Sequence, residues 1–353
     1  MTKYYSLWGL ISIPGCNMGG AEEVDIGEYQ RLILIDLTWA NARALEKRLG
    51  QEKVLEIFRP HYIHSGMAIL MNITKALEYS SKDAETLSNV GIFIFESLWH
   101  TMPISRTLTE RGLVTDWPCC CIQSAPWVAR RLICDVANIG VTQQMNSDYE
   151  LLNIECLDKG SDHCEYIVRN KSDHAKDWKL AGKVDKLVEV PSFPHDQKRW
   201  FAVAGISELW ILYAQALMEW SGMEDTMKAL RSEIVELSAK WGGRIVLLAD
   251  YDAKGVNRVL SSMDSFNAIM GIEGKTVFSS SDRHEMEISI CPFASSPPEI
   301  GMQLETFCQG LCKFIDDDYE LQFLSRMCGG DKTCHRIIRK RLTARGKGKA
   351  PVQ

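Results

Sequence analysis

Residues 148–169, DYELLNIECLDKGSDHCEYIVR, recur 170 positions later as residues 318–339, DYELQFLSRMCGGDKTCHRIIR. The two segments align without a gap, and their glycine, their last cysteine and their final arginine are among the identical positions. Further matched positions are Cys121 with Cys291 at the same offset and, at an offset of 172, Ala42 with Ala214 and Gly50 with Gly222. Two long co-linear blocks indicate a tandem duplication.

The duplication divides the chain into segments. The expected order is an N-terminal segment (1–19), a first copy (20–185), a linker (186–196), a second copy (197–342) and a basic tail (343–353). Pro191 and Pro194 disfavour both helix and strand in the linker. The tail has no apolar periodicity and is expected to be disordered. The two copies are expected to pair as an intrachain pseudo-dimer, and a homodimer is a further candidate.

Composition narrows the class of protein. Of the 353 residues 46% are apolar and 24% charged, with a net charge of -6, as in soluble globular proteins. Basic residues form no stripe before the tail, which argues against a nucleic-acid partner. Twelve scattered cysteines favour a reducing, cytoplasmic location. The apolar run before Cys16 is short and broken by Pro14, so neither a signal peptide nor a membrane partner is predicted.

Hydrophobic periodicity predicts the same order of elements in both copies. Helical spacing covers 27–49, 52–80 and 84–100 in the first copy, and 199–220, 224–241 and 254–270 in the second. A strand, a cysteine-bearing loop, a helix that begins near a proline and two strands around a glycine turn follow in each copy. In HEMEISI (284–290), Met286, Ile288 and Ile290 are expected to share one face. The predicted fold class is α+β, with two tandem copies of a module whose helices pack on an antiparallel sheet.

The cysteines of the second copy carry a resemblance to known families. The chain reads Cys291-Pro-Phe-Ala, then Phe307-Cys308, then Gly330-Asp331-Lys-Thr-Cys334. This pattern resembles the L-2-amino-thiazoline-4-carboxylic acid hydrolase-like family. The closing hairpins also resemble the 4-vinyl reductase domain, in which two cysteines separated by seven residues help to hold zinc beside a small-molecule pocket. Cys156 and Cys164 have that spacing.

The second copy keeps more of this pattern than the first. Asn138 stands in the first copy where the second has Cys308, and Ser161 stands where it has Asp331. The acid that the hydrolase-like pattern carries after Phe-Cys is absent until Asp316. One working site is therefore expected, in the second copy.

A catalytic site is one interpretation of these residues. A thiolate is both a nucleophile and a soft metal ligand, and a helix that begins after Cys291 would favour the ionised thiol. The candidate catalytic residues are Cys291, Asp331 and His335, and the candidate metal ligands are Cys156, Cys164, Cys308 and Cys334, with zinc as the candidate cofactor. The resemblance implies hydrolytic opening of a small ring through a C-N or C=N bond.

Other interpretations stay open. The cysteines also suit core packing, and Cys328 with Cys334 also suits a redox pair. The stretch FESLWHTMP suggests a ligand pocket from Glu96, Trp99 and His100, with Cys121 as the member of the triplet 119–121 that aligns with Cys291. Two functions follow: a hydrolase of a small heterocyclic or carboxylated substrate, or a non-catalytic zinc-containing binding or sensor module for a small hydrophobic ligand.

Overall fold

The computed structural model describes a large part of the chain. The described residues are 26–60, 62, 73, 77, 83–109, 112–118, 122, 125–137, 148–156, 160–171, 186–249 and 253–341. Cys121, the N-terminal segment and the tail 343–353 lie outside them. The chain forms two compact units: the first-sheet unit takes in Ala42–Leu209, and the second-sheet unit takes in Glu23–Asn41 and Trp210–Gln353.

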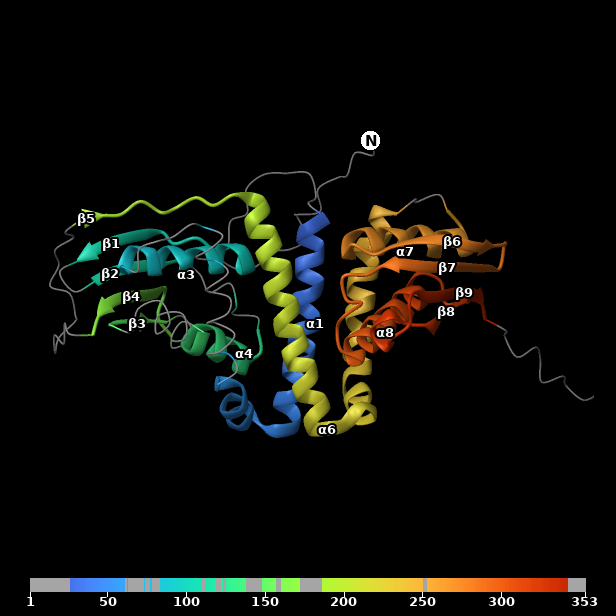
Figure 1. Cartoon of the computed structure of the whole chain (residues 1–353), viewed down its shortest axis with the longest axis horizontal. Coiled ribbons are helices and arrows are strands. Elements are labelled where there is room, and N and C mark those ends of the chain that lie inside the picture. Colours follow the sequence, from blue (N-terminus) through green and yellow to red (C-terminus); the bar gives the residue numbers. More distant parts are fainter. Residues whose placement is uncertain are drawn as a thin grey trace, which may run out of the picture. The chain divides into compact units, whose positions relative to one another are not determined.

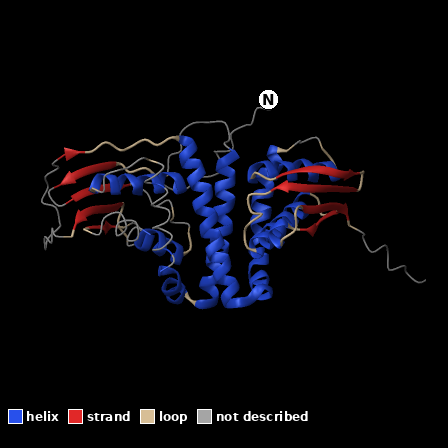
Figure 2. Cartoon of the chain, viewed as in Figure 1, coloured by secondary structure: helices blue, strands red, loops and turns tan. Residues whose placement is uncertain are grey.

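The two copies have the same order of elements (Figures 1 and 2). In the first copy these are α3 (Ala84–Trp99), β1 (Ser105–Thr109), β2 (Gly112–Trp117), α4 (Trp127–Arg131) continued by a π-helical turn (Leu132–Ala137), β3 (Tyr149–Glu155), β4 (Cys164–Asn170) and β5 (Lys186–Leu187). In the second copy they are α7 (Val256–Met270), β6 (Glu273–Ser279), β7 (Arg283–Ile290), α8 (Pro298–Ile315), β8 (Tyr319–Ser325), the 3-10 turn η4 (Met327–Gly329) and β9 (Cys334–Lys340). The predicted α+β class and its tandem modules are confirmed.

Each copy opens with two helices joined at a glycine. Helix α1 (Ile26–Leu49) is followed by Gly50, with φ of 80°, and by helical residues 51–60. Helix α6 (His195–Leu248) contains a non-helical corner at Gly222, with φ of 74°. Residues other than glycine rarely adopt this positive φ, so the aligned glycines account for both corners. The predicted helices 27–49, 199–220 and 224–241 are confirmed, whereas most of 61–80 lies outside the described residues.

Helix α6 is also the one described helix that is long and apolar enough to cross a membrane. Half of its most apolar window is buried within the protein, and core helices of soluble proteins share this composition.

The two sheets are antiparallel and have matching strand orders. These orders are β3-β4-β2-β1-β5 and β8-β9-β7-β6. A bulge lies between Asn153 and Glu155 and another between Phe323 and Ser325, 170 positions apart. Ion pairs also recur at this offset, since Arg169 binds Glu150 and Arg339 binds Glu320, each at 2.7 Å. The duplication is therefore preserved down to the register of the last hairpin.

In the second-sheet unit, one face of the sheet is buried. Strand β7 contributes Met286 and Ile288 to this face, while β9 contributes Cys334 and Arg336 as their direct partners. Helix α8 contacts β8 and α7 contacts β9, and both helices lie on the same side of the sheet (Figure 1). Ile290 was expected on the buried face, but it is 51% exposed, because it lies beyond the last pair of β7 with β9.

Helix α8 is held in place from two sides. Gly310 lies against Ser238 of α6, and Phe314 of α8 lies against Gly242, so closely that a Cβ atom on either glycine would collide. On its other side, Gln303 exchanges hydrogen bonds of 2.8 and 2.9 Å with Asn41 of α1. Because these amides are wholly buried, their reciprocal pairing fixes the position of α8.

Candidate functional site

A cavity lies beneath the second sheet, between the sheet and helix α8. It has about 560 Å³ of empty space, open solvent included. The lining residues are Phe266, Ile272, Ile288, Cys291, Phe293, Gly301, Leu304, Glu305, Cys308, Phe323, Arg326, Met327, Cys328, Cys334 and Arg336. Most of these side chains are apolar, and the charged ones are two arginines and one glutamate.

Four cysteines line this cavity from four different segments. Cys291 follows β7, Cys308 lies on α8, Cys328 lies in η4, and Cys334 begins β9. The sequence led us to expect that Cys291, Cys308 and Cys334 lie near one another, and all three line the cavity. Cys328 joins them, since its sulfur packs directly over Gly301 of α8.

The thiols of Cys291, Cys308 and Cys328 are held in the neutral form. Burial raises the pKa of Cys308 to about 12, and burial also raises the pKa of Cys291 and of Cys328. A hydrogen bond from the backbone of Phe293 lowers the pKa of Cys291, but the effect of burial is larger. Because the thiolate is the reactive form, the helix that follows Cys291 does not by itself create the activated nucleophile that we expected.

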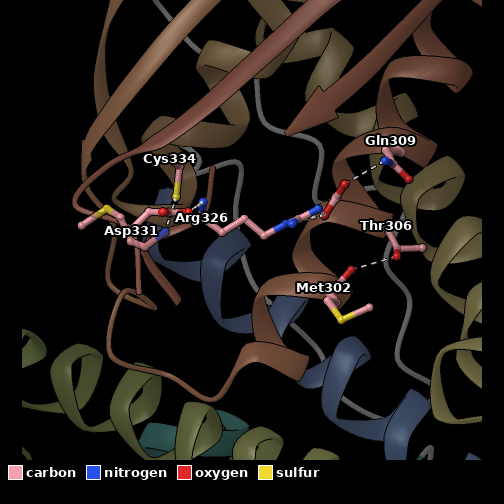
Figure 3. A network of polar contacts seen from close by, with 8 residues as sticks. Met302, Thr306, Gln309, Arg326, Asp331 and Cys334 are labelled. Carbon is pink, nitrogen blue, oxygen red and sulfur yellow. Dashed lines mark hydrogen bonds and ion pairs between the residues drawn. The ribbon is translucent and has the colours of Figure 1, made fainter. Parts of the chain in front are cut away.

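Arg326 and Glu305 both line the cavity and form an ion pair, which is among the contacts drawn in Figure 3. The Nε atom of Arg326 donates to Oε2 of Glu305 at 2.7 Å, and Gln309 donates to the other carboxylate oxygen at 3.1 Å. This pair was not found from the sequence, because Glu305 and Arg326 lie on different elements and no spacing rule connects them.

Asp331 holds the turn between β8 and β9. Its Oδ2 atom accepts a hydrogen bond of 2.8 Å from the backbone N–H of Arg326. In the first copy the aligned Ser161 accepts from the backbone N–H of Cys156 at 3.4 Å. Asp331 does not line the cavity. Its recognisable role is therefore in the hairpin, alongside Gly330, which has φ of 96°.

His335 lies on the other face of the sheet from the cavity. Side chains alternate along a strand, and the neighbours Cys334 and Arg336 occupy the buried face. The Nε2 atom of His335 lies 3.0 Å from a carboxylate oxygen of Glu285 on β7. Of the three candidate catalytic residues, only Cys291 lines the cavity.

Arg336 is the feature of the cavity that the sequence analysis missed. It is only 2% exposed and lies in the middle of the buried face, between Met286 of β7 and Phe323 of β8. Its guanidinium donates to Asn267 of α7 at 3.0 Å and contacts the sulfur of Met286 at 3.1 Å. The alternation Cys334, Arg336, Ile338 in the sequence could have placed it on the buried face.

The first copy differs at the aligned positions. Tyr166 occupies the place of Arg336, and its hydroxyl hydrogen-bonds with Cys134. Cys156 and Cys164, the candidate zinc ligands of this copy, are both buried, as is Tyr166. Burial raises the pKa of Tyr166 well above its usual value. The two modules therefore share a fold but differ in charge at this position.

The stretch around His100 is the end of a helix. Glu96 forms an ion pair with Lys198 of α6, and Trp99 is 8% exposed. His100 is exposed and caps α3 in the left-handed conformation, with φ of 52°. None of these side chains lines the cavity beneath the second sheet.

The residues that could coordinate zinc can be compared with what a zinc site requires. Within the described residues, no three His, Cys, Asp or Glu side chains come together as a metal site requires. Cys156 and Cys164 lie in the first-sheet unit and Cys308 and Cys334 in the second-sheet unit, so zinc at these cysteines stays a prediction.

Comparison with family models, with curated proteins and with solved structures returns no match to this chain.

Proposed function

We propose that the second module binds a small, largely apolar molecule in the cavity between its sheet and helix α8. The observation that carries this proposal is the cavity itself, because it is hollowed beneath the sheet and its walls are mostly apolar. Phe266, Phe293 and Phe323 supply aromatic surface, and neutral thiols add polarisable apolar contacts.

The walls of the cavity are supported by rigid elements. Phe266 stacks on Phe307 of α8 with ring centroids 5.3 Å apart, and Phe293 packs against Trp210 at 5.6 Å. Trp210 in turn donates to Gln303 at 2.8 Å. A cavity bounded in this way is preformed, so little ordering cost opposes ligand binding.

Hydrolysis through Cys291 is the second candidate function. It is favoured by the presence of Cys291, Cys308 and Cys334 along one cavity. It is opposed by the raised pKa of the Cys291 thiol and by the position of His335 on the far face of the sheet. A thiolate titration by ultraviolet absorbance separates the two functions, since a hydrolase of this kind needs an ionised thiol near neutral pH.

The binding proposal is tested by filling the cavity. Leu304→Trp places a large ring in the lining, whereas Leu324→Trp makes the same change at an exposed position of β8. Calorimetric titration uses the neutral aromatic probe naphthamide. We expect Leu304→Trp to weaken binding about tenfold or more, and Leu324→Trp to leave the dissociation constant unchanged.

Two results would count against the proposal. One is the absence of naphthamide binding to the wild-type protein. The other is equal binding by both tryptophan variants, with circular dichroism showing that both are folded.

A further inference from the structure

Arg336 is a buried positive charge that forms no ion pair with any of the described residues. Its Nε–H group is buried and donates to no partner among them, and none of its described contacts is an ion pair. Asp264 of α7 interacts with Arg336 only through space, and the carboxylate is on an exposed residue. A guanidinium has five N–H donors, and the two contacts to Asn267 and Met286 leave most of them for another acceptor.

The other arginine of the cavity provides a contrast. Arg326 is already neutralised by Glu305, and its side chain is 39% exposed. Arg336 lines the same cavity, but the groups that it contacts through hydrogen bonds are neutral. With Glu305 offsetting Arg326, the charged side chains of the lining leave one net positive charge, and that charge lies on the most deeply buried of them.

Burial of such a charge is costly unless a ligand or the protein compensates it. A carboxylate is the group that best matches a guanidinium, since its two oxygens accept parallel N–H donors. We infer that the cavity of the second module takes a monoanionic ligand, an apolar carboxylic acid whose carboxylate binds Arg336. This inference rests on the proposed function and names the chemical class of the ligand.

The first copy lacks the arginine of this site, so we expect only one such site in each chain. Tyr166 replaces Arg336 at the aligned position and carries no positive charge. The expected stoichiometry is therefore one carboxylate per chain, bound in the second-sheet unit.

The experiment compares naphthoate with its neutral amide, naphthamide, by calorimetric titration of the full chain. Arg336→Met removes the charge, Arg336→Lys keeps it without the planar pair of donors, and Arg339→Met is the control. Arg339 lies on the same strand but is exposed and paired with Glu320.

We expect the wild-type protein to bind one naphthoate about tenfold or more tightly than naphthamide. Arg336→Met should bring the two dissociation constants together, chiefly by weakening the binding of naphthoate. Arg336→Lys should restore part of the preference, and Arg339→Met should keep all of it.

Equal binding of the acid and the amide by the wild-type protein would overturn the inference and leave the proposed function standing. A preference for naphthoate that survives in Arg336→Met would also overturn it, because a group other than Arg336 would then bind the carboxylate. Failure of both probes to bind the wild-type protein would contradict the proposed function and the inference together. The comparison of naphthoate with naphthamide on the wild-type protein tests the inference even where a variant does not fold.

Discussion

The thiols of Cys308 and Cys312 show how strongly a single residue depends on its surroundings. Burial raises the pKa of each to about 12, whereas an ordinary thiol ionises near 8.5. Both side chains lie on the buried face of α8, four residues apart. They behave as apolar packing groups at neutral pH, which is the structural interpretation that the sequence left open.

These raised pKa values predict a loss of stability in alkali. The stabilisation is complete below the pKa of the unfolded thiol, because both states are then protonated alike. As the pH rises from about 9 to about 12, the unfolded state releases protons that the folded state retains, so the free energy of unfolding falls. Urea unfolding across this range should show that fall, and Cys308→Ala or Cys312→Ala should reduce it.

Leu304→Ala is the matched control for this prediction. It also shortens a buried side chain of α8 but removes no titratable group, so it should lower stability about equally at every pH. If both cysteine variants lose as much stability in alkali as the wild-type protein, the thiols are not responsible.

At the scale of elements, Gly301 determines how closely α8 approaches the last hairpin. A Cβ atom at this position would lie 1.9 Å from the sulfur of Cys328 and 3.2 Å from its Cβ atom. The turn η4 can therefore pack over α8 only where the helix has no side chain. This contact closes one side of the cavity.

Gly301→Ala is predicted to destabilise the protein by about 1–3 kcal/mol, in spite of the better helix propensity of alanine. Gly243→Ala, where the space around the new Cβ atom is open, should instead stabilise α6 by about 0.5–1 kcal/mol. Chemical denaturation measures both changes. Addition of Cys328→Ala should recover part of the loss in Gly301→Ala, and the absence of any coupling would refute the contact.

Many of the helices and strands could be predicted from the sequence. Helical periodicity located α1, α3 and α7, and the repeat located both hairpins, because these depend on local patterns. The partners of Arg326 and Arg336 could not be predicted, since Glu305 and Asn267 come from separate helices. Asp331 and His335 lie near Cys334 in the sequence, but the turn and the strand alternation place both outside the cavity lining.

At the scale of the whole molecule, each compact unit contains residues of both copies. The second-sheet unit includes Glu23–Asn41, and the first-sheet unit continues to Leu209. Within the second-sheet unit, Asp36 of α1 accepts a hydrogen bond of 2.8 Å from Trp241 and pairs with Lys240 at 2.6 Å. The boundaries of the copies, 20–185 and 197–342, stay a prediction about sequence, and the compact units do not follow them.

Because the second-sheet unit includes residues of α1, we predict that a fragment of residues 186–353 does not fold fully alone. It lacks the α1 residues that pair with Gln303 and Trp241, so buried polar groups would lose their partners. Adding a peptide of residues 23–49 in trans should raise its melting temperature. An Asn41→Leu peptide should do so less well, and a fragment that unfolds cooperatively at the same temperature without the peptide would contradict the prediction.

The central claim is that the cavity of the second module holds an apolar carboxylate on Arg336. A crystal structure of the full chain with naphthoate tests it most directly. We predict density for the naphthalene ring among Phe266, Phe293 and Phe323, with the carboxylate within hydrogen-bonding distance of the Arg336 guanidinium. Naphthoate bound outside this cavity, or inside it with its carboxylate turned away from Arg336, would contradict the claim.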